Sequence, residues 1–286
     1  MSVFNGRQHM KVQELADWIT EREMLRIRKE ERKYPPPWTA DPILANYRFC
    51  NVRREDDKVT RWIRTNWSKK HAGHPNMLLA MTLARMVNRI ESLEVLGFPE
   101  EWDPALFKGI ARDTQSSGLK FWGNAYTIST CGRKMLKEDY VADHVLSKVH
   151  DLQLAMTKLD NPTLDYYHKM LMNSVDGLGS FLAAQVVADL KHTPLHALRD
   201  AADWWVWAAV GPGSKRGLDR FDGAAQGTFT ARLATAARVV GQCIWPELRK
   251  KMDMQDWQNC MCEFDKYLRL KEGGHARNRY VAASAG

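Results

Sequence analysis

One stretch of apolar residues repeats with the period of an α-helix, and it constrains the fold class of this chain more than any other feature. Between residues 76 and 96, large apolar side chains recur at steps of four, three, four and three, at Leu79, Leu83, Met86, Ile90 and Leu93. This spacing puts all of them on one helix face, which must be buried against other elements. Gly97 follows at the position of a left-handed helix terminator. The spacing predicts one buried helix over residues 76–96.

Helix-type patterns recur along the rest of the chain, whereas strand-type patterns are scarce. Further helices are expected over residues 11–33, 55–66, 139–155, 163–174, 180–191, 196–208, 227–243 and 253–270. The best strand candidate, residues 121–130, is short. These patterns predict an all-α protein.

A run of three prolines, Pro35 to Pro37, interrupts the helical pattern near the N-terminus. Proline cannot continue a helix, so the run is expected to separate two parts of the chain. We expect residues 1–37 to form a basic helical N-terminal extension. Residues 38–286 are expected to form one helical catalytic domain with a helical hairpin near residues 164–191.

The charge balance indicates an anionic partner. The 286 residues include 42 Lys and Arg against 34 Asp and Glu, a net charge of +8, and most of the excess lies in the first 70 residues. A basic excess together with 11 Trp is typical of proteins that bind nucleic acid or a polyphosphate. A protein that is merely basic is the alternative.

Several other classes of protein are disfavoured by the sequence. No apolar run reaches the roughly 18 residues of a membrane span, and the N-terminus has no apolar signal core, so neither membrane association nor export is expected. The five cysteines are odd in number and scattered, as reduced cytoplasmic thiols are. There is no GxxxxGK[ST] loop, no CxxC pair and no HExxH, so we expect no P-loop, no metal site and no cofactor.

Residues 164–191 predict two helices joined by a tight turn. The first helix is expected to end near Asn173, a turn follows over residues 175–179, and the second helix starts at Ser180. Gly177 and Gly179 leave backbone N–H groups uncovered, where they can hold a phosphate. The segment resembles the helix-hairpin-helix with which DNA glycosylases grip duplex DNA, and a plain helical hairpin is the alternative.

A second turn follows at the distance found in those glycosylases, but it lacks their acid. Residues 206–221 read VWAAVGPGSKRGLDRF, and Lys215 and Arg216 occupy the region where a catalytic Asp would be expected. Asp219 comes late, on the far side of the turn. Two basic residues at a glycine-rich helix start favour a phosphate or pyrophosphate over a sugar cation.

Five blocks in this chain resemble, in order, a family of phage enzymes that hypermodify thymine. These blocks are WTADPILANYRFCNVRREDDKVTRWI from residue 38, FWGNAYTIST from 121, DGLGSFLAAQVVADL from 176, GPGSKRG from 211 and CEFDKYLR from 262. They are similar to the α-glutamyl/putrescinyl-thymine pyrophosphorylases and the related amino acid:DNA transferases. The same helical module occurs in 5-hydroxymethyluracil DNA kinases.

The resemblance implies a helix-hairpin-helix, glycosylase-like fold and a reaction on polymeric DNA. Family enzymes act in the cytoplasm of the phage-infected bacterium on double-stranded DNA containing phosphorylated 5-hydroxymethyluracil. They replace the phosphate or pyrophosphate with an amine, whose donor is putrescine, glutamate or glycine. A DNA glycosylase using an unexpected acid such as Asp219, or a DNA-binding module without chemistry, are the alternatives.

The matched blocks also imply roles for individual residues. The catalytic candidates are Arg54, Glu55, Asp57 and Asp189, of which the two aspartates are favoured as the base that takes a proton from the amine. Substrate-binding candidates are Asn51, Tyr126, Gln185, Lys215, Arg216, Asp265 and Lys266. DNA-binding candidates are Gly177, Gly179, Ser180, Lys58 and Arg61.

Ordinary structural roles are open for the same residues. The acids near residue 55 could be favoured at a solvated helix start, and Asp189 could pair with Lys191. Residues 262–269 could form a structural helix with surface ion pairs. The cluster of Trp204, Trp205 and Trp207 is expected to be core packing.

Overall fold

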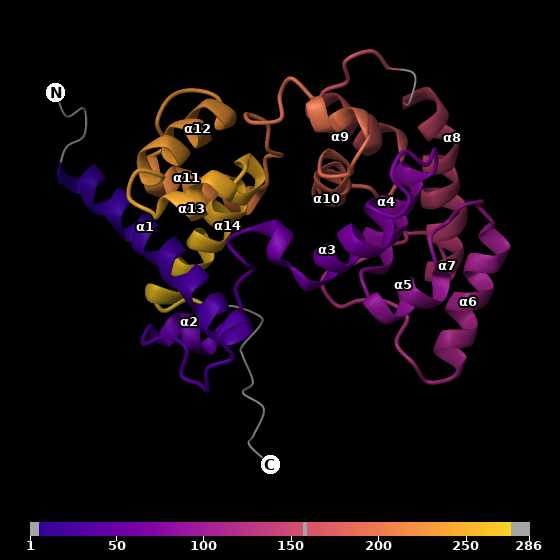
Figure 1. The fold of residues 1–286 in the computed structure, drawn as a ribbon, viewed down its shortest axis with the longest axis horizontal. Helices are drawn as coiled ribbons and strands as arrows, with labels where there is room; N and C mark the ends of the chain where they lie inside the picture. Colours follow the sequence, from indigo (N-terminus) through magenta and orange to yellow (C-terminus); the bar gives the residue numbers. More distant parts are fainter. Residues whose placement is uncertain (1–5, 157–158, 276–286) are drawn as a thin grey trace. The chain divides into compact units, whose positions relative to one another are not determined.

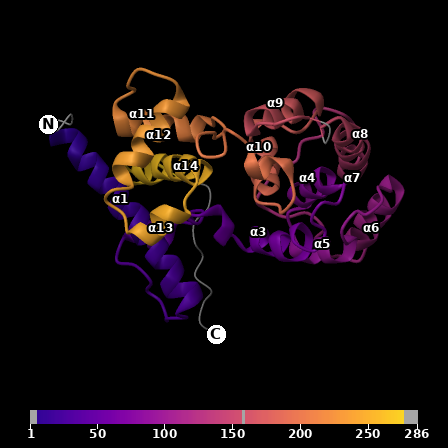
Figure 2. The same ribbon diagram turned by 45° about the horizontal axis from the view of Figure 1, so that its top comes forward.

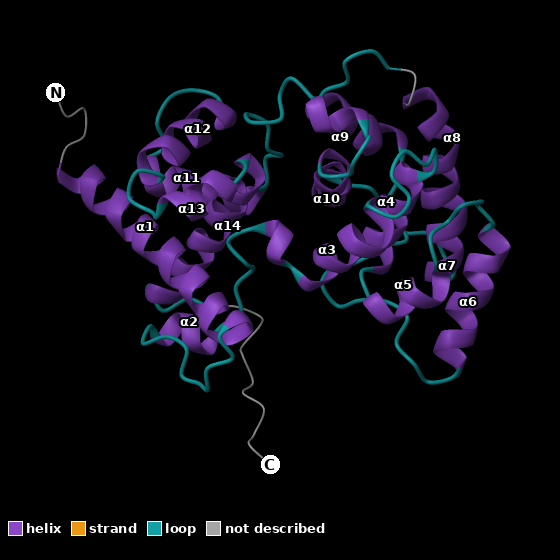
Figure 3. Ribbon diagram, viewed as in Figure 1, coloured by secondary structure: helices purple, strands orange, loops and turns teal. Residues whose placement is uncertain are grey.

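The computed structural model describes residues 6–156 and 159–275, which form helices joined by loops, with no strand among them (Figure 3). The all-α prediction is confirmed. The described residues divide into two compact units, one of residues up to 57 together with those from 210 onward, the other of residues 58–209 (Figure 1). No helix of the described residues is long and apolar enough to cross a membrane.

The first unit is built around its last helix. Its helices are α1 (Gly6–Arg26), α2 (Pro42–Asn46), α11 (Pro212–Asp222), α12 (Phe229–Val240), α13 (Pro246–Lys251) and α14 (Met254–Lys271). Helix α11 lies along α14, and α1 and α12 pack beside them (Figure 2). The buried ring of Trp18 on α1 lies 5.2 Å from the ring of Phe264 on α14. The first 37 residues were expected to form a separate extension, but α1 contributes to the core of this unit.

The second unit surrounds a fully buried helix. Its helices are α3 (Lys58–Ile63), α4 (Met77–Val87), α5 (Ile90–Leu96), α6 (Pro104–Ser116), α7 (Lys137–Asp139), α8 (Ser147–Met156), α9 (Leu164–Ser174) and α10 (Ser180–Lys191). Every residue of α4 is buried, and α4 packs against α8 and α10, while α9 packs against α10 (Figures 1 and 2). Burial of this largely apolar helix contributes to the hydrophobic core of the unit.

The predicted helix over residues 76–96 is two helices. Asn88 adopts a left-handed conformation with φ of +47° and ends α4, and α5 begins at Ile90. An asparagine tolerates this conformation better than most residues, so it can terminate a helix inside a continuous apolar pattern. Gly97 ends α5 at the predicted position, with φ of +69° and ψ of 176°, which is a glycine conformation outside the left-handed helical region that the sequence predicted.

Two other predicted elements are absent. Residues 121–130 form a loop, and the Gly123 N–H donates to the carbonyl of Val87 at the end of α4 rather than to a neighbouring strand. Residues 196–208 form only a 3₁₀ turn (Ala197–Asp200) followed by turns. In that segment the Asp203 carboxylate accepts hydrogen bonds from the N–H groups of Leu164 and Asp165 at the start of α9. Asp203 therefore caps another helix instead of lying within one.

Candidate functional site

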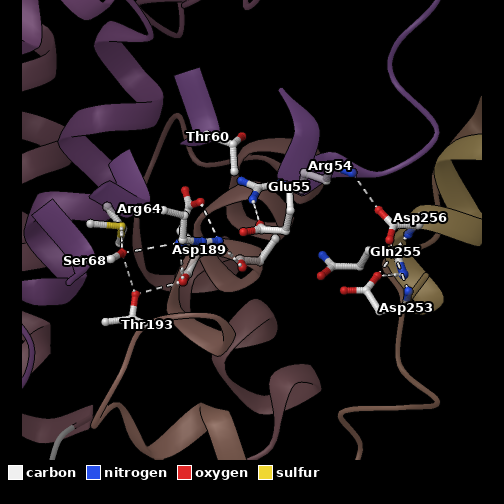
Figure 4. Close-up of polar contacts among 12 residues, drawn as sticks. Arg54, Glu55, Thr60, Arg64, Ser68, Asp189, Thr193, Asp253, Gln255 and Asp256 are labelled. Carbon is white, nitrogen blue, oxygen red and sulfur yellow. Dashed lines mark hydrogen bonds and ion pairs between the residues drawn. The ribbon is translucent and has the colours of Figure 1, made fainter. Parts of the chain in front are cut away.

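The segment that carries Arg54 is attached to the start of α14 in the first unit. The Arg54 N–H donates to the Asp256 carboxylate at 2.8 Å (Figure 4). Asp256 also accepts the Asp253 N–H, and Asp253 caps α14. The amide of Asn259, one turn further along α14, donates to the carbonyl of Asn51 at 3.2 Å. These contacts fix the backbone of the candidate catalytic block through helix-capping hydrogen bonds.

The charged side chains of residues 53–56 form several ion pairs. The Arg54 guanidinium lies 3.5 Å from the Glu55 carboxylate, and Arg53 lies 3.4 Å from Asp56. Asp56 in turn lies 3.7 Å from Arg26. Asp57 follows at an exposed position. The block therefore presents one exposed and one half-buried carboxylate, Asp57 and Glu55, on a fixed backbone.

A second group of charges in the same unit gathers on one buried carboxylate. Asp265 on α14 is almost fully buried, and its oxygens lie 3.1 Å from Arg216, 3.1 Å from Arg220 and 3.3 Å from Arg269. Each arginine is engaged through Nε, and its side chain remains between one-third and just over one-half exposed. We call Arg216, Arg220, Asp265 and Arg269 the arginine cluster. Arg220 is also paired with Glu272 at 2.7 Å, so three cations face two anions, and the remaining positive charge lies at Arg216 and Arg269, where guanidinium groups bind phosphate oxygens well.

Two predicted substrate-binding lysines, Lys215 and Lys266, lie outside this cluster. Lys215 pairs with Asp219 one turn along α11 at 2.7 Å. Lys266 donates to the carbonyl of Arg48 and lies 4.5 Å from the centre of the Phe49 ring. Both contacts hold local structure together. Of the expected phosphate-binding pair, the structure brings Arg216 together with Asp265, and it directs Lys215 elsewhere.

The glycines of GPGSKRG bring two helices into contact. A Cβ on Gly217 would overlap the carbonyl of Met261, and one on Gly213 would overlap the Sγ of Cys262. Gly211 is the N-cap of α11, and Pro212 is its first residue. The motif therefore allows α11 to approach α14 closely, which places Arg216 and Arg220 beside Asp265.

Asp189 lies in the core of the second unit. Its side chain is fully buried, and its two oxygens accept hydrogen bonds from Arg85 at 2.6 and 2.8 Å. Arg64 lies 3.3 Å from the same carboxylate and donates to the backbone carbonyls of Asp189 and Ala188 (Figure 4). Thr60 accepts a further hydrogen bond from Arg85 at 2.9 Å. We call Arg64, Arg85 and Asp189 the buried triad.

This geometry gives Asp189 a structural task. Two guanidinium groups stabilise the ionised carboxylate, and burial keeps it from a substrate dissolved in water. The triad joins the end of α10 to α3, α4 and the π-helical turn Arg64–Ser68. A carboxylate held in this way positions α10. The alternative partner, Lys191, instead lies 4.3 Å from the centre of the Trp204 ring.

The helical hairpin is present as predicted, with α9 ending at Ser174 and α10 starting at Ser180. Gly177 has φ of +90°, and a Cβ there would lie 2.7 Å from the Tyr140 hydroxyl, so the turn requires glycine. Gly179 is the exposed N-cap of α10. The backbone carbonyl of Ser180 lies 2.9 Å from Nε2 of His168, which braces the turn against α9.

The remaining candidates of the second unit occupy its surface. Tyr126 is half-buried and meets the exposed Phe181 ring edge-on at 5.3 Å. Gln185 is half-buried on α10, and Lys58 and Arg61 are exposed on α3. The candidates are thus divided: Asn51, Arg54, Glu55, Asp57, Lys215, Arg216, Asp265 and Lys266 belong to the first unit, and the others belong to the second.

Several charged residues that shape these groups were absent from the sequence prediction. Arg220 and Arg269 complete the arginine cluster, and Arg64 and Arg85 complete the buried triad. A signal for each was present. Arg220 follows Arg216 by four residues and Arg269 follows Asp265 by four, a spacing that shares a helix face. Arg85 interrupts an apolar helix as Asp189 does, and two such opposite charges are expected to pair.

The contacts of the described residues also bear on a glycosylase reaction and on a metal site. Asp219 is paired with Lys215 and Arg232, whose hydrogen bonds hold the pKa of its carboxyl below the usual range. A carboxylate stabilised in this way is a poor candidate for the acid of a glycosylase. Within the described ranges, no group of three His, Cys, Asp or Glu side chains is arranged to hold a metal ion.

Comparison with known proteins decides the family. The family model for the helical domain of 5-hmdU DNA kinase matches residues 10–276, nearly the whole chain. The chain belongs to this family. A family member, the 5-hmdU DNA kinase of Bacillus phage SP10, is 25% identical over 223 residues, which cover 70% of this chain and 34% of that kinase. The chain thus matches about a third of the length of its relative. No solved structure matches.

This membership confirms the broader of the two resemblances found in the sequence, the one to the 5-hydroxymethyluracil-modifying family. The chain shares the helical module of the 5-hydroxymethyluracil-modifying phage enzymes, as the five blocks indicated. The narrower resemblance, to enzymes that transfer an amine to thymine, stays a prediction. The glycosylase likeness of the hairpin also stays a prediction.

Proposed function

We propose that this chain is a transferase of phage thymine hypermodification, acting on phosphorylated 5-hydroxymethyluracil in double-stranded DNA. The observation that carries this proposal is the family match along residues 10–276. The proposed place of action is the cytoplasm of the infected bacterium. The amine donor is a small molecule of the class of putrescine, glutamate or glycine.

The proposed reaction is a substitution at the carbon attached to position 5 of uracil. The bond from this carbon to the phosphate or pyrophosphate oxygen breaks, and the leaving group keeps the electron pair. A new bond forms between the same carbon and the amine nitrogen, which loses one proton. The protein must therefore stabilise negative charge on the departing oxygens and accept that proton.

The arginine cluster supports the first of these requirements. Asp265 holds Arg216 and Arg269 through Nε, so their other guanidinium N–H groups can reach phosphate oxygens, whereas Arg220 also donates to Glu272. Fixing the side chains in advance reduces the entropy lost when a phosphate binds. We assign Arg216 and Asp265 to phosphate recognition and extend the assignment to Arg220 and Arg269.

The block around residue 55 supports the second requirement. Asp57 is exposed, and Glu55 is half-buried beside Arg54, so both carboxylates lie at the surface of the unit, in a block that resembles the family's. We assign the proton acceptor to this pair and treat Asp189 as a positioning residue. Asn51, Tyr126, Gln185, Lys215 and Lys266 stay proposed substrate contacts. Gly177, Gly179, Ser180, Lys58 and Arg61 stay proposed DNA contacts.

Release of the leaving group tests this proposal. DNA containing 5-phosphomethyl- or 5-pyrophosphomethyl-uracil would be incubated with the protein, with and without a mixture of amino acids and putrescine. We expect phosphate or pyrophosphate release that requires both the protein and an amine, and that is lost in Arg216→Gln with Arg269→Gln. Release without an amine, or no release in any mixture, would refute the amine transfer.

A DNA-binding module without its own chemistry is the second candidate. It is favoured by the burial of Asp189 in the triad, which removes one of the two preferred bases from the surface. This alternative predicts tight binding to modified DNA and no change in the nucleosides. It also predicts that Asp57→Asn and Glu55→Gln together leave every measurable function intact.

A further inference from the structure

A surface pocket in the second unit combines tryptophan rings with basic side chains. The pocket has a volume of about 500 Å³ and is lined by Lys191, His192, Arg199, Asp200, Trp204 and Trp205. This volume lies within the range of about 300–1,000 Å³ that small-ligand sites occupy. The lining belongs wholly to the end of α10 and the turns after it.

Trp205 is the unexpected member of this pocket. The sequence predicted that Trp204, Trp205 and Trp207 pack together in the core, but only Trp207 is buried, and Trp205 is 66% exposed. A single exposed aromatic ring is common on protein surfaces, but Trp205 lies in a pocket beside a second tryptophan, and contiguous aromatic surface of this kind is typical of binding sites. The centres of the Trp204 and Trp205 rings lie 4.5 Å apart and the rings are tilted, so the pair forms one continuous aromatic surface.

The segment that carries Trp205 is anchored on both sides. Before it, the Asp203 carboxylate caps α9, and the Asp203 carbonyl accepts the N–H groups of Val206 and Trp207. After it, the Trp207 indole donates to Asp165 at 3.2 Å and packs on His168. The exposure of Trp205 is therefore fixed by a hydrogen-bonded turn.

The neighbouring charges select the kind of ligand. The Lys191 ammonium is buried and lies 4.3 Å from the centre of the Trp204 ring, so the aromatic surface already carries a cation. Arg199 and His192 add basic groups, and Asp200 is the single acid of the lining. A cationic ligand such as a polyamine would be repelled, whereas a planar ligand with a negative group is complementary.

We propose that this pocket binds one unstacked nucleotide of the DNA, with its base on Trp205 and its phosphate beside Arg199. This inference rests on the proposed action on DNA and adds a second contact site to it. Base stacking on an aromatic side chain tolerates any sequence, because every base has a flat face. The pocket would hold a base that has left the helical stack.

Affinity for a fluorescent single-stranded oligonucleotide tests this inference in the full chain. We expect Trp205→Ala to weaken binding roughly 5- to 150-fold, the range for loss of one stacked base. Trp205→Phe should remain within about threefold of the wild type, because it keeps a ring. Leu119→Ala is the matched control, since Leu119 is also 66% exposed in this unit.

The salt dependence separates stacking from charge. Trp205→Ala should leave the slope of log affinity against log salt unchanged, while Arg199→Gln should lower it by about 0.7, the value for one single-strand phosphate. Lys148→Gln, an exposed lysine on α8, should not change it. Equal affinities of wild type and Trp205→Ala would overturn the pocket alone. Absence of binding of the single-stranded oligonucleotide to the wild type would also overturn the pocket, whereas the proposed function is refuted separately, by absence of binding to duplex DNA that contains the phosphorylated base.

Discussion

Replacing Asp189 by asparagine should destabilise the second unit rather than remove a catalytic base. The substitution keeps the shape of the side chain and removes its charge. Arg85 and Arg64, which are both buried, then lose the carboxylate that offsets their charges. The substitution removes the carboxylate that faces both guanidinium groups, so the buried network loses the charge that stabilises it.

The size of the effect follows from the contacts that are lost. The carboxylate accepts two hydrogen bonds from Arg85 and lies 3.3 Å from Arg64, so the substitution breaks a buried network. Removing one partner of such a network costs about 3–5 kcal/mol. For a unit of the size of residues 58–209, each kcal/mol lowers the melting temperature by about 2–4 °C, giving a decrease of about 6–20 °C.

Thermal unfolding followed by circular dichroism at 222 nm measures this effect directly. The matched control is Asp151→Asn, because Asp151 is an exposed aspartate on α8 of the same unit and should change stability by less than about 0.5 kcal/mol. A variant Asp189→Asn that melts with the wild type but loses activity would refute the structural assignment and restore Asp189 as a catalytic residue.

Three further predictions concern the pH response, helix packing and DNA contacts. Burial lowers the pKa of His196 from 6.5 to about 4, and its Nδ1 accepts the Leu198 N–H. The neutral imidazole therefore contributes to the free energy of unfolding above pH 6.5, and this contribution is lost as the pH falls towards 4. Between pH 7 and pH 5 this loss should be about 2 kcal/mol in denaturant titrations, and His196→Asn should abolish it; an equal loss in the variant would contradict the assignment. In the same titrations, Gly217→Ala should destabilise the first unit by several kcal/mol. The control is Gly109→Ala in α6, where a Cβ meets open space, and it should stabilise the protein by about 0.5–1 kcal/mol. A Gly217→Ala variant as stable as the wild type would show that the close α11–α14 contact is wrong. Arg216→Gln with Arg269→Gln should lower the salt slope of duplex binding by about 2, and an unchanged slope would exclude the arginine cluster from DNA contact.

Local patterns in the sequence predicted most helices because their apolar spacing reflects burial. The helices that were missed, α2, α6, α11 and α13, all start at a proline. In α2 and α6, an Asp before the proline accepts backbone N–H groups as the N-cap. This Asp-Pro signal is present in the sequence, and it marks the start of a helix even where the helix is too short or too polar to show an apolar period. In α11 the glycines concealed the helix, because their role lies in packing on α14.

The candidate site was harder to predict because it depends on contacts between distant residues. Asp189 stood out correctly as a charge on an apolar helix, but its partner Arg85 lies 104 residues away. Tertiary packing decides whether such a residue takes part in catalysis or forms a buried ion pair. The exposure of Trp205 likewise follows from the capping role of Asp203, which no local pattern reveals.

The most direct test of the account is the mass of the nucleosides after reaction. DNA with 5-phosphomethyl- or 5-pyrophosphomethyl-uracil would be incubated with the protein and a pool of amino acids and putrescine, then digested to nucleosides and weighed. The account predicts a new nucleoside in which one amine has replaced the phosphate or pyrophosphate, and its mass names the donor. Unchanged nucleosides despite tight DNA binding, or loss of the base, would contradict it.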